Sequence, residues 1–68
     1  MKNLYRITRT NRMNSSTRYQ LNTSETIEET MKPFTDKFEA VVIQQTPTEA
    51  VVSTPDYIYN FNLVPEEE

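Results

Sequence analysis

Hydrophobic and polar residues alternate with a period of two in the first third of the chain, the pattern of β-strands with one buried face. Tyr5 and Ile7 alternate with polar residues inside a strand that we expect at residues 3–12. A polar Asn-Ser-Ser-Thr segment follows, with residue types that favour turns, and Tyr19 and Leu21 then alternate in the same way. The pattern predicts a β-hairpin.

The period changes to 3.6 residues beyond this hairpin, as in an amphipathic helix. Four apolar residues recur at helical spacing: Ile27, Met31, Phe34 and Phe38. Either Asn22 or Thr23 is the expected N-terminal cap, because acidic residues follow both. Pro33 removes one main-chain hydrogen bond, so the helix is expected either to be kinked over residues 24–37 or to end near Met31.

β-Branched and aromatic residues predominate in three further segments, at residues 38–44, 49–53 and 57–64, which predicts three more strands. The resulting β-β-α-β-β-β order predicts an α+β fold. We expect a small two-layer sandwich, in which one amphipathic helix packs on an antiparallel or mixed sheet. Residues 1–65 are expected to form this single domain, and residues 66–68 an acidic disordered tail.

The last of these strands has an aromatic face made of Tyr57, Tyr59, Phe61 and Leu63, which we expect in the hydrophobic core. If this strand lies at the edge of the sheet, its backbone is free to pair with the same strand of a second copy. A homodimer through an edge strand is therefore a further expectation.

Three residue types are absent from the 68 residues: cysteine, histidine and glycine. The chain therefore has no disulfide and no Cys or His ligands for a metal, and it lacks the phosphate-binding loops that depend on glycine. Exposed carboxylate pairs such as Glu28 and Glu29 are the only acid–base candidates, so we expect neither an enzyme nor a bound cofactor or metal. The sequence shows no membrane span and no signal peptide, which favours a cytoplasmic protein.

Positive charge is concentrated in the first third of the chain. Residues 1–23 carry five Lys and Arg and no acid, whereas residues 24–68 carry two lysines and ten acids, which together give the net charge of −3. Arginine and tyrosine are enriched in the hot spots of protein interfaces, and three of the arginines are expected near the tip of the hairpin. The predicted partner-binding residues are Arg6, Arg9, Arg12, Arg18 and Tyr19.

This charge distribution predicts a small protein-binding regulator or inhibitor that occupies a surface of a larger protein. A nucleic-acid-binding module that uses the basic hairpin and a small structural subunit of a larger assembly are the alternatives, and the arginines could also contact the protein's own acidic residues. In size and order of elements the chain resembles the small proteins with which bacteriophages block host enzymes, polymerase inhibitors among them. The resemblance implies a host protein as the partner and the cytoplasm of a bacterial host as the location.

Overall fold

The computed structural model describes residues 2–65. These residues form one helix and five strands, in the order β1 (Asn3–Asn11), β2 (Thr17–Ser24), α1 (Ile27–Thr35), β3 (Val41–Gln45), β4 (Glu49–Ser53) and β5 (Tyr57–Val64). The fold is a small α+β fold with the predicted order of elements. No helix among the described residues is long and apolar enough to cross a membrane. The predicted acidic tail at residues 66–68 lies outside the described part of the chain.

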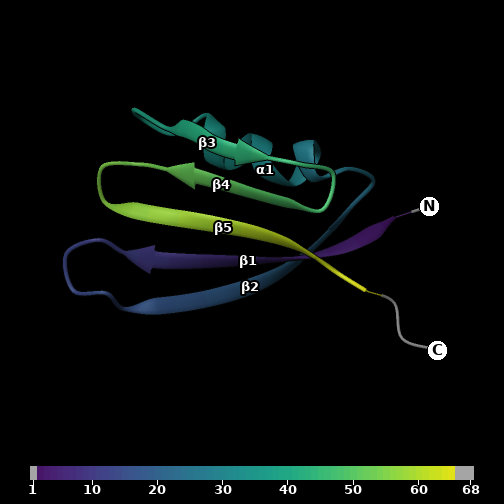
Figure 1. The fold of residues 1–68 in the computed structure, drawn as a ribbon, viewed down its shortest axis with the longest axis horizontal. Coiled ribbons are helices and arrows are strands. Elements are labelled where there is room, and N and C mark those ends of the chain that lie inside the picture. The colour runs from purple at the N-terminus through teal and green to yellow at the C-terminus, as the bar shows by residue number, and fades with distance from the viewer. Residues whose placement is uncertain (1, 66–68) are drawn as a thin grey trace.

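The five strands form one antiparallel sheet in the spatial order β2-β1-β5-β4-β3 (Figure 1). The last strand, β5, lies in the middle of the sheet and pairs with β1 on one side and with β4 on the other. The idea that the strand at residues 57–64 pairs with a second copy is therefore wrong, because both of its edges are occupied. The free edges of the sheet belong to β2 and β3.

The hydrophobic core lies between α1 and one face of the sheet. Its buried members are Tyr5, Ile7, Ile27, Met31, Ala50, Val52, Tyr59 and Phe61. Phe34 of α1 adds to this core, since its ring centroid lies 4.8 Å from that of Tyr59 and 5.3 Å from that of Phe61. The aromatic face predicted for the last strand is confirmed as part of the core, and no helix of residues 2–65 lies on the opposite face of the sheet.

The helix begins later than predicted. Its N-terminal cap is Thr26, whose Oγ1 accepts a hydrogen bond from the N–H of Glu29 at 3.3 Å. The carboxylate of Glu29 in turn accepts one from the N–H of Glu25 at 3.2 Å, so two main-chain donors at the helix start are satisfied by side chains. The prediction of Asn22 or Thr23 as the cap is wrong, because β2 continues through both residues.

Pro33 lies inside α1 without ending it. The helix continues to Thr35, and the N–H of Asp36 still donates to the carbonyl of Lys32 at 3.2 Å. Pro33 is exposed, so its ring lies on the solvent side and the missing N–H costs one hydrogen bond there. The predicted alternative of a helix that ends near Met31 is therefore wrong.

The segment between α1 and β3 is a turn rather than part of a strand. Phe38 is 82 % exposed and lies beyond the end of the helix, so its predicted place on the apolar helix face is wrong. The backbone reverses at Glu39, which has a φ of 56°, and β3 begins only at Val41. This turn separates Phe38 from the β-branched residues of β3, so Phe38 is not part of that strand.

Two turns use the left-handed backbone region without glycine, at Ser15 (φ 60°) and at Glu39 (φ 56°). The Cβ atom makes this region unfavourable, by roughly 1–2 kcal/mol for a residue other than glycine. Both positions lie in exposed turns, so no packing obstructs a substitution. The chain therefore retains conformational strain that a glycine would remove.

We expect Glu39→Gly to stabilise the protein by about 0.5 kcal/mol, because the relieved strain exceeds the extra entropy that glycine gives the unfolded chain. For a domain of this size the midpoint of thermal unfolding should rise by about 2–4 °C, which circular dichroism measures. Glu39→Ala is the matched control, since it removes the charge and keeps the Cβ atom. An equal rise in both variants would show that the charge, and not the backbone, is responsible.

Candidate partner-binding surface

The residues predicted to bind a partner all belong to the β1–β2 hairpin, but the structure divides them among different sides of the sheet. Side chains along β1 alternate between the face that bears α1 and the uncovered face. Arg9 shares the helix-bearing face with Tyr5 and Ile7, whereas Arg6 lies on the uncovered face. The predicted residues are therefore not one cluster.

Arg9 and Arg18 lie directly opposite each other in the β1–β2 ladder. The guanidinium carbon of Arg9 is 4.8 Å from the centroid of the Tyr57 ring, which is a cation–π distance. Both arginines line a groove of about 190 Å³, together with Phe34 and Tyr59. Like charges directly across a ladder are destabilising, so this pair favours the approach of an acidic group.

Tyr59, which lines this groove, is neutral. Burial raises the pKa of the Tyr59 hydroxyl above its usual value, and the nearby positive charge of Arg9 only partly opposes this shift. Since the ordinary pKa of tyrosine is already about 10, the hydroxyl keeps its proton at neutral pH. No negative charge from Tyr59 therefore offsets the two arginines.

Arg12 makes contacts inside the protein. Its Nη1 donates to Oγ of Ser53 at 2.9 Å and to the carbonyl of Thr54 at 3.3 Å, and its backbone N–H donates to the carbonyl of Asp56 at 3.0 Å. These bonds join the end of β1 to the turn between β4 and β5. Arg12 therefore supports the fold.

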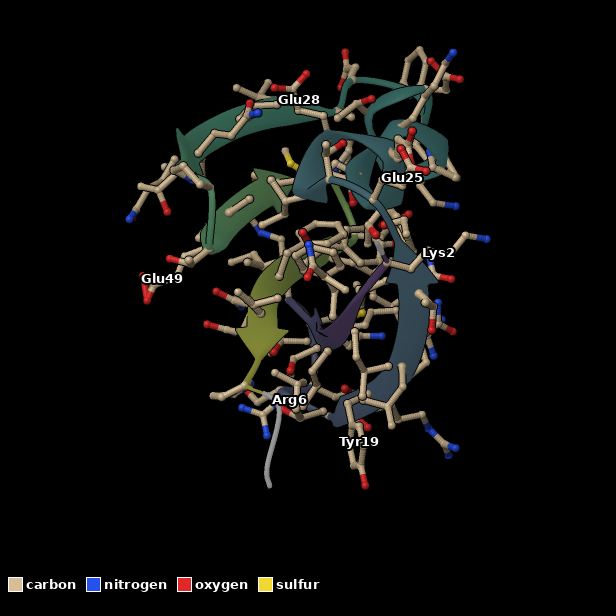
Figure 2. The ribbon with its side chains drawn as sticks, turned by 90° about the vertical axis from the view of Figure 1, so that its right-hand side faces the viewer. Lys2, Arg6, Tyr19, Glu25, Glu28 and Glu49 are labelled. Carbon is tan, nitrogen blue, oxygen red and sulfur yellow. The ribbon has the colours of Figure 1, made fainter. Side chains whose placement is uncertain are left out.

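Arg6 and Tyr19 lie on the uncovered face and point away from α1 (Figure 2). Tyr19 is 69 % exposed, and Leu21, which lies opposite Arg6 in the ladder, is 55 % exposed. Leu4, two residues before Arg6 on β1, lies on the same face and is paired with Val64 of β5. We name this group the Arg6 patch; its members are Leu4, Arg6, Tyr19, Leu21 and Val64. It places apolar side chains around a single positive charge.

The sequence reasoning named Arg6 and Tyr19 but missed the other apolar members of this patch. Tyr19 and Leu21 alternate with polar residues in the same way as Tyr5 and Ile7, which gives no sign that the two pairs lie on opposite faces. The ladder instead pairs odd-numbered residues of β1 with even-numbered residues of β2, which turns the apolar residues of β2 to the uncovered face. Arg18, Gln20 and Asn22 alternate just as regularly with Tyr19 and Leu21, so the sequence of β2 offers two possible inner faces. Only the register shows which of the two faces α1.

The charge asymmetry along the chain is also an asymmetry in space. Figure 2 shows Arg6 and Tyr19 at one end of the molecule and Glu28 at the other. Glu28 and Glu29 line a larger groove of about 510 Å³ between α1 and β3. Within residues 2–65, the contacts of Arg9 and Arg12 are with an aromatic ring and with neutral oxygens.

The function of this chain has to be inferred from its own residues and their geometry. No known protein family, no curated protein and no solved structure matches it.

Proposed function

We propose that this chain is a non-enzymatic, protein-binding regulator or inhibitor that covers part of the surface of a larger protein. In this proposal the molecule is a two-layer sandwich, in which α1 protects one face of the sheet and the other face meets the partner. The observation that carries the proposal is the Arg6 patch, where the exposed Tyr19 and Leu21 flank an arginine.

The chemistry of the patch supports a protein partner with an acidic group among apolar side chains. Tyrosine and arginine contribute the largest energies in protein interfaces, because each combines a broad apolar surface with a polar end. Positive charge on this side of the molecule would also speed the approach of an acidic partner. The resemblance in size and element order to small bacteriophage proteins that block host enzymes supports a host protein in the cytoplasm as that partner.

Reversal of the charge at Arg6 tests the proposal. The tagged protein captures its partner from a lysate of the cells in which it occurs, and the identified partner is then titrated in purified form. We expect Arg6→Glu to weaken this binding at least about tenfold, since it places a like charge against the acidic group of the partner. Arg6 is exposed, so the circular dichroism spectrum should not change.

The matched control is Lys32→Glu, which changes the net charge by the same amount on the far side, in the groove between α1 and β3. Unchanged binding by Arg6→Glu, or an equal loss with Lys32→Glu, would contradict the proposal. Capture that disappears after nuclease treatment would support the nucleic-acid alternative instead. Arg12 is unsuitable for this test, because its replacement would also break the bonds to Ser53 and Thr54.

A further inference from the structure

The two free edges of the sheet differ in how well they are protected against pairing with another strand. β3 is five residues long and has a register shift between Val42 and Gln44, and such irregularities block the addition of a strand. β2 is eight residues long, pairs with β1 without a shift, and contains no proline. Its residues are exposed except for the half-buried Ser24. Natural proteins rarely leave an edge of this kind unpaired.

The hydrogen-bond pattern shows which groups of β2 are available. Paired residues in an antiparallel ladder alternate between hydrogen-bonded and non-hydrogen-bonded pairs. The N–H of Asn11 donates to the carbonyl of Ser16 at 2.8 Å, which makes this pair, and every second pair after it, hydrogen-bonded. The backbone groups that point away from β1 are consequently those of Thr17, Tyr19, Leu21 and Thr23.

We propose that two copies of this chain associate through β2, antiparallel, around a twofold axis at Gln20. The two five-stranded sheets then form one continuous sheet. Tyr19 lies opposite Leu21 of the second copy, Gln20 opposite Gln20, and Arg18 opposite Asn22. This pairing shares Tyr19 and Leu21 with the Arg6 patch, but it joins two copies of this chain through the backbone of β2, whereas the proposed function concerns a larger partner that contacts side chains of the uncovered face.

This register satisfies both the backbone and the side chains of the edge. Each outward-pointing residue of β2 lies opposite another outward-pointing residue, so their N–H and C=O groups can all pair. Tyr19 and Leu21, which are largely exposed in the single chain, become cross-strand neighbours on the uncovered face. A twofold axis through Arg18 would instead bring the two copies of this arginine together. The register at Gln20 avoids that repulsion.

Charge complementarity selects a second copy as the occupant of this edge. In the antiparallel arrangement, the basic hairpin of one copy runs beside the start of α1 in the other. Arg18 of the second copy projects on the helix-bearing side opposite Asn22, three residues before Glu25. The carboxylate of Glu29 lies close by, since it accepts a hydrogen bond from the N–H of Glu25. Because of the twofold symmetry, this contact between a basic and an acidic segment occurs twice in the dimer.

The same contact relieves a conflict inside the single chain. Arg18 and Arg9 face each other directly across the ladder, and a carboxylate from outside would compensate that pair. The side chain of Glu25 is exposed, and its backbone makes the bonds to Asn3 and Glu29, so substitution of the side chain leaves those bonds in place. Arg18 and Glu25 are therefore suitable positions for a charge exchange.

Analytical ultracentrifugation of the purified chain over a concentration series tests the proposal. We expect a monomer–dimer equilibrium whose dissociation constant rises at least about tenfold in Arg18→Glu and in Glu25→Lys, because each variant brings like charges together at both contacts. An equimolar mixture of the two variants should restore the dimer, since both contacts then join opposite charges. Lys32→Glu, which changes the net charge as Arg18→Glu does, should dimerise like the unchanged chain.

A second variant tests the backbone pairing independently of charge. Leu21→Pro removes an N–H that points away from β1, so the chain should keep its circular dichroism spectrum and become monomeric. A monomer at every concentration, a mixture that stays monomeric, or a dimer that persists in Leu21→Pro would each overturn the proposal. Arg6→Glu should leave the dimer intact, so failure of dimerisation and failure of partner capture are separate results.

Discussion

Replacement of Phe61 by alanine is expected to unfold much of the protein at room temperature. The Phe61 side chain is fully buried, and its ring packs edge-on against Phe34 of α1 at 5.3 Å between centroids. It also lies between Ile7 of β1 and Ala50 of β4, so its removal leaves a cavity where α1 meets the centre of the sheet. Such a truncation costs about 3–5 kcal/mol.

That cost is comparable to the whole stability of a chain of this length. At about 0.05–0.15 kcal/mol per residue, the free energy of unfolding is roughly 3–10 kcal/mol. Urea titration followed by circular dichroism should show the midpoint fall sharply in Phe61→Ala. Phe38→Ala is the matched control, since the same atoms are removed from a side chain that is 82 % exposed, and we expect a change within about 0.5 kcal/mol. Equal effects of the two substitutions would refute the assignment of the core.

Proline at two successive positions of β2 should have opposite consequences. In the alternation set by the bond from Asn11 to Ser16, Gln20 and Ile7 form a hydrogen-bonded pair, whereas Leu21 and its partner on β1 do not. Gln20→Pro therefore removes a donor from the carbonyl of Ile7, a residue that is 2 % exposed. An unsatisfied buried carbonyl costs about 1–3 kcal/mol, and crowding of β1 by the proline ring adds to this.

Leu21→Pro lacks that penalty, because the N–H that it removes points away from the sheet. The free energies of unfolding of both variants, measured by urea titration at concentrations where the chain is monomeric, check the prediction. Gln20→Pro should be the less stable by at least about 1 kcal/mol. The opposite order would mean that the N–H of Leu21, and not that of Gln20, donates to β1. It would also remove the basis for dimerisation through this edge.

The positions of most elements were predictable because the signals are local. The segments at residues 49–53 and 57–64 coincide with β4 and β5, whose period of two reflects the alternation of side chains in any strand. The ends of the helix were less predictable. Thr26 and Glu29 form the cap, yet Asn22 and Thr23 offered similar chemistry a few residues earlier, and only the length of β2 decides among them.

The candidate site was predictable as a segment but not as a surface. The arginines of the first hairpin stand out by charge alone, and all of the predicted partner-binding residues lie on or directly beside its two strands. Their distribution depends on the register, which brings Arg9 opposite Arg18 and Arg6 opposite Leu21. The role of Arg12 depends on a turn more than forty residues away, so no local pattern could have indicated its bonds to Ser53 and Thr54.

The sequence by itself determined the α+β class, the order of the elements, the aromatic contribution of the last strand to the core, and the separation of basic and acidic segments. These follow from periodicity and composition over short windows. Only the tertiary structure decided that β5 lies at the centre of the sheet, that β2 is left as an open edge, and that Tyr19 and Leu21 face away from α1. The physical reason is that strand order and register arise from hydrogen bonds between distant segments, and a shift of one residue turns every side chain to the other face.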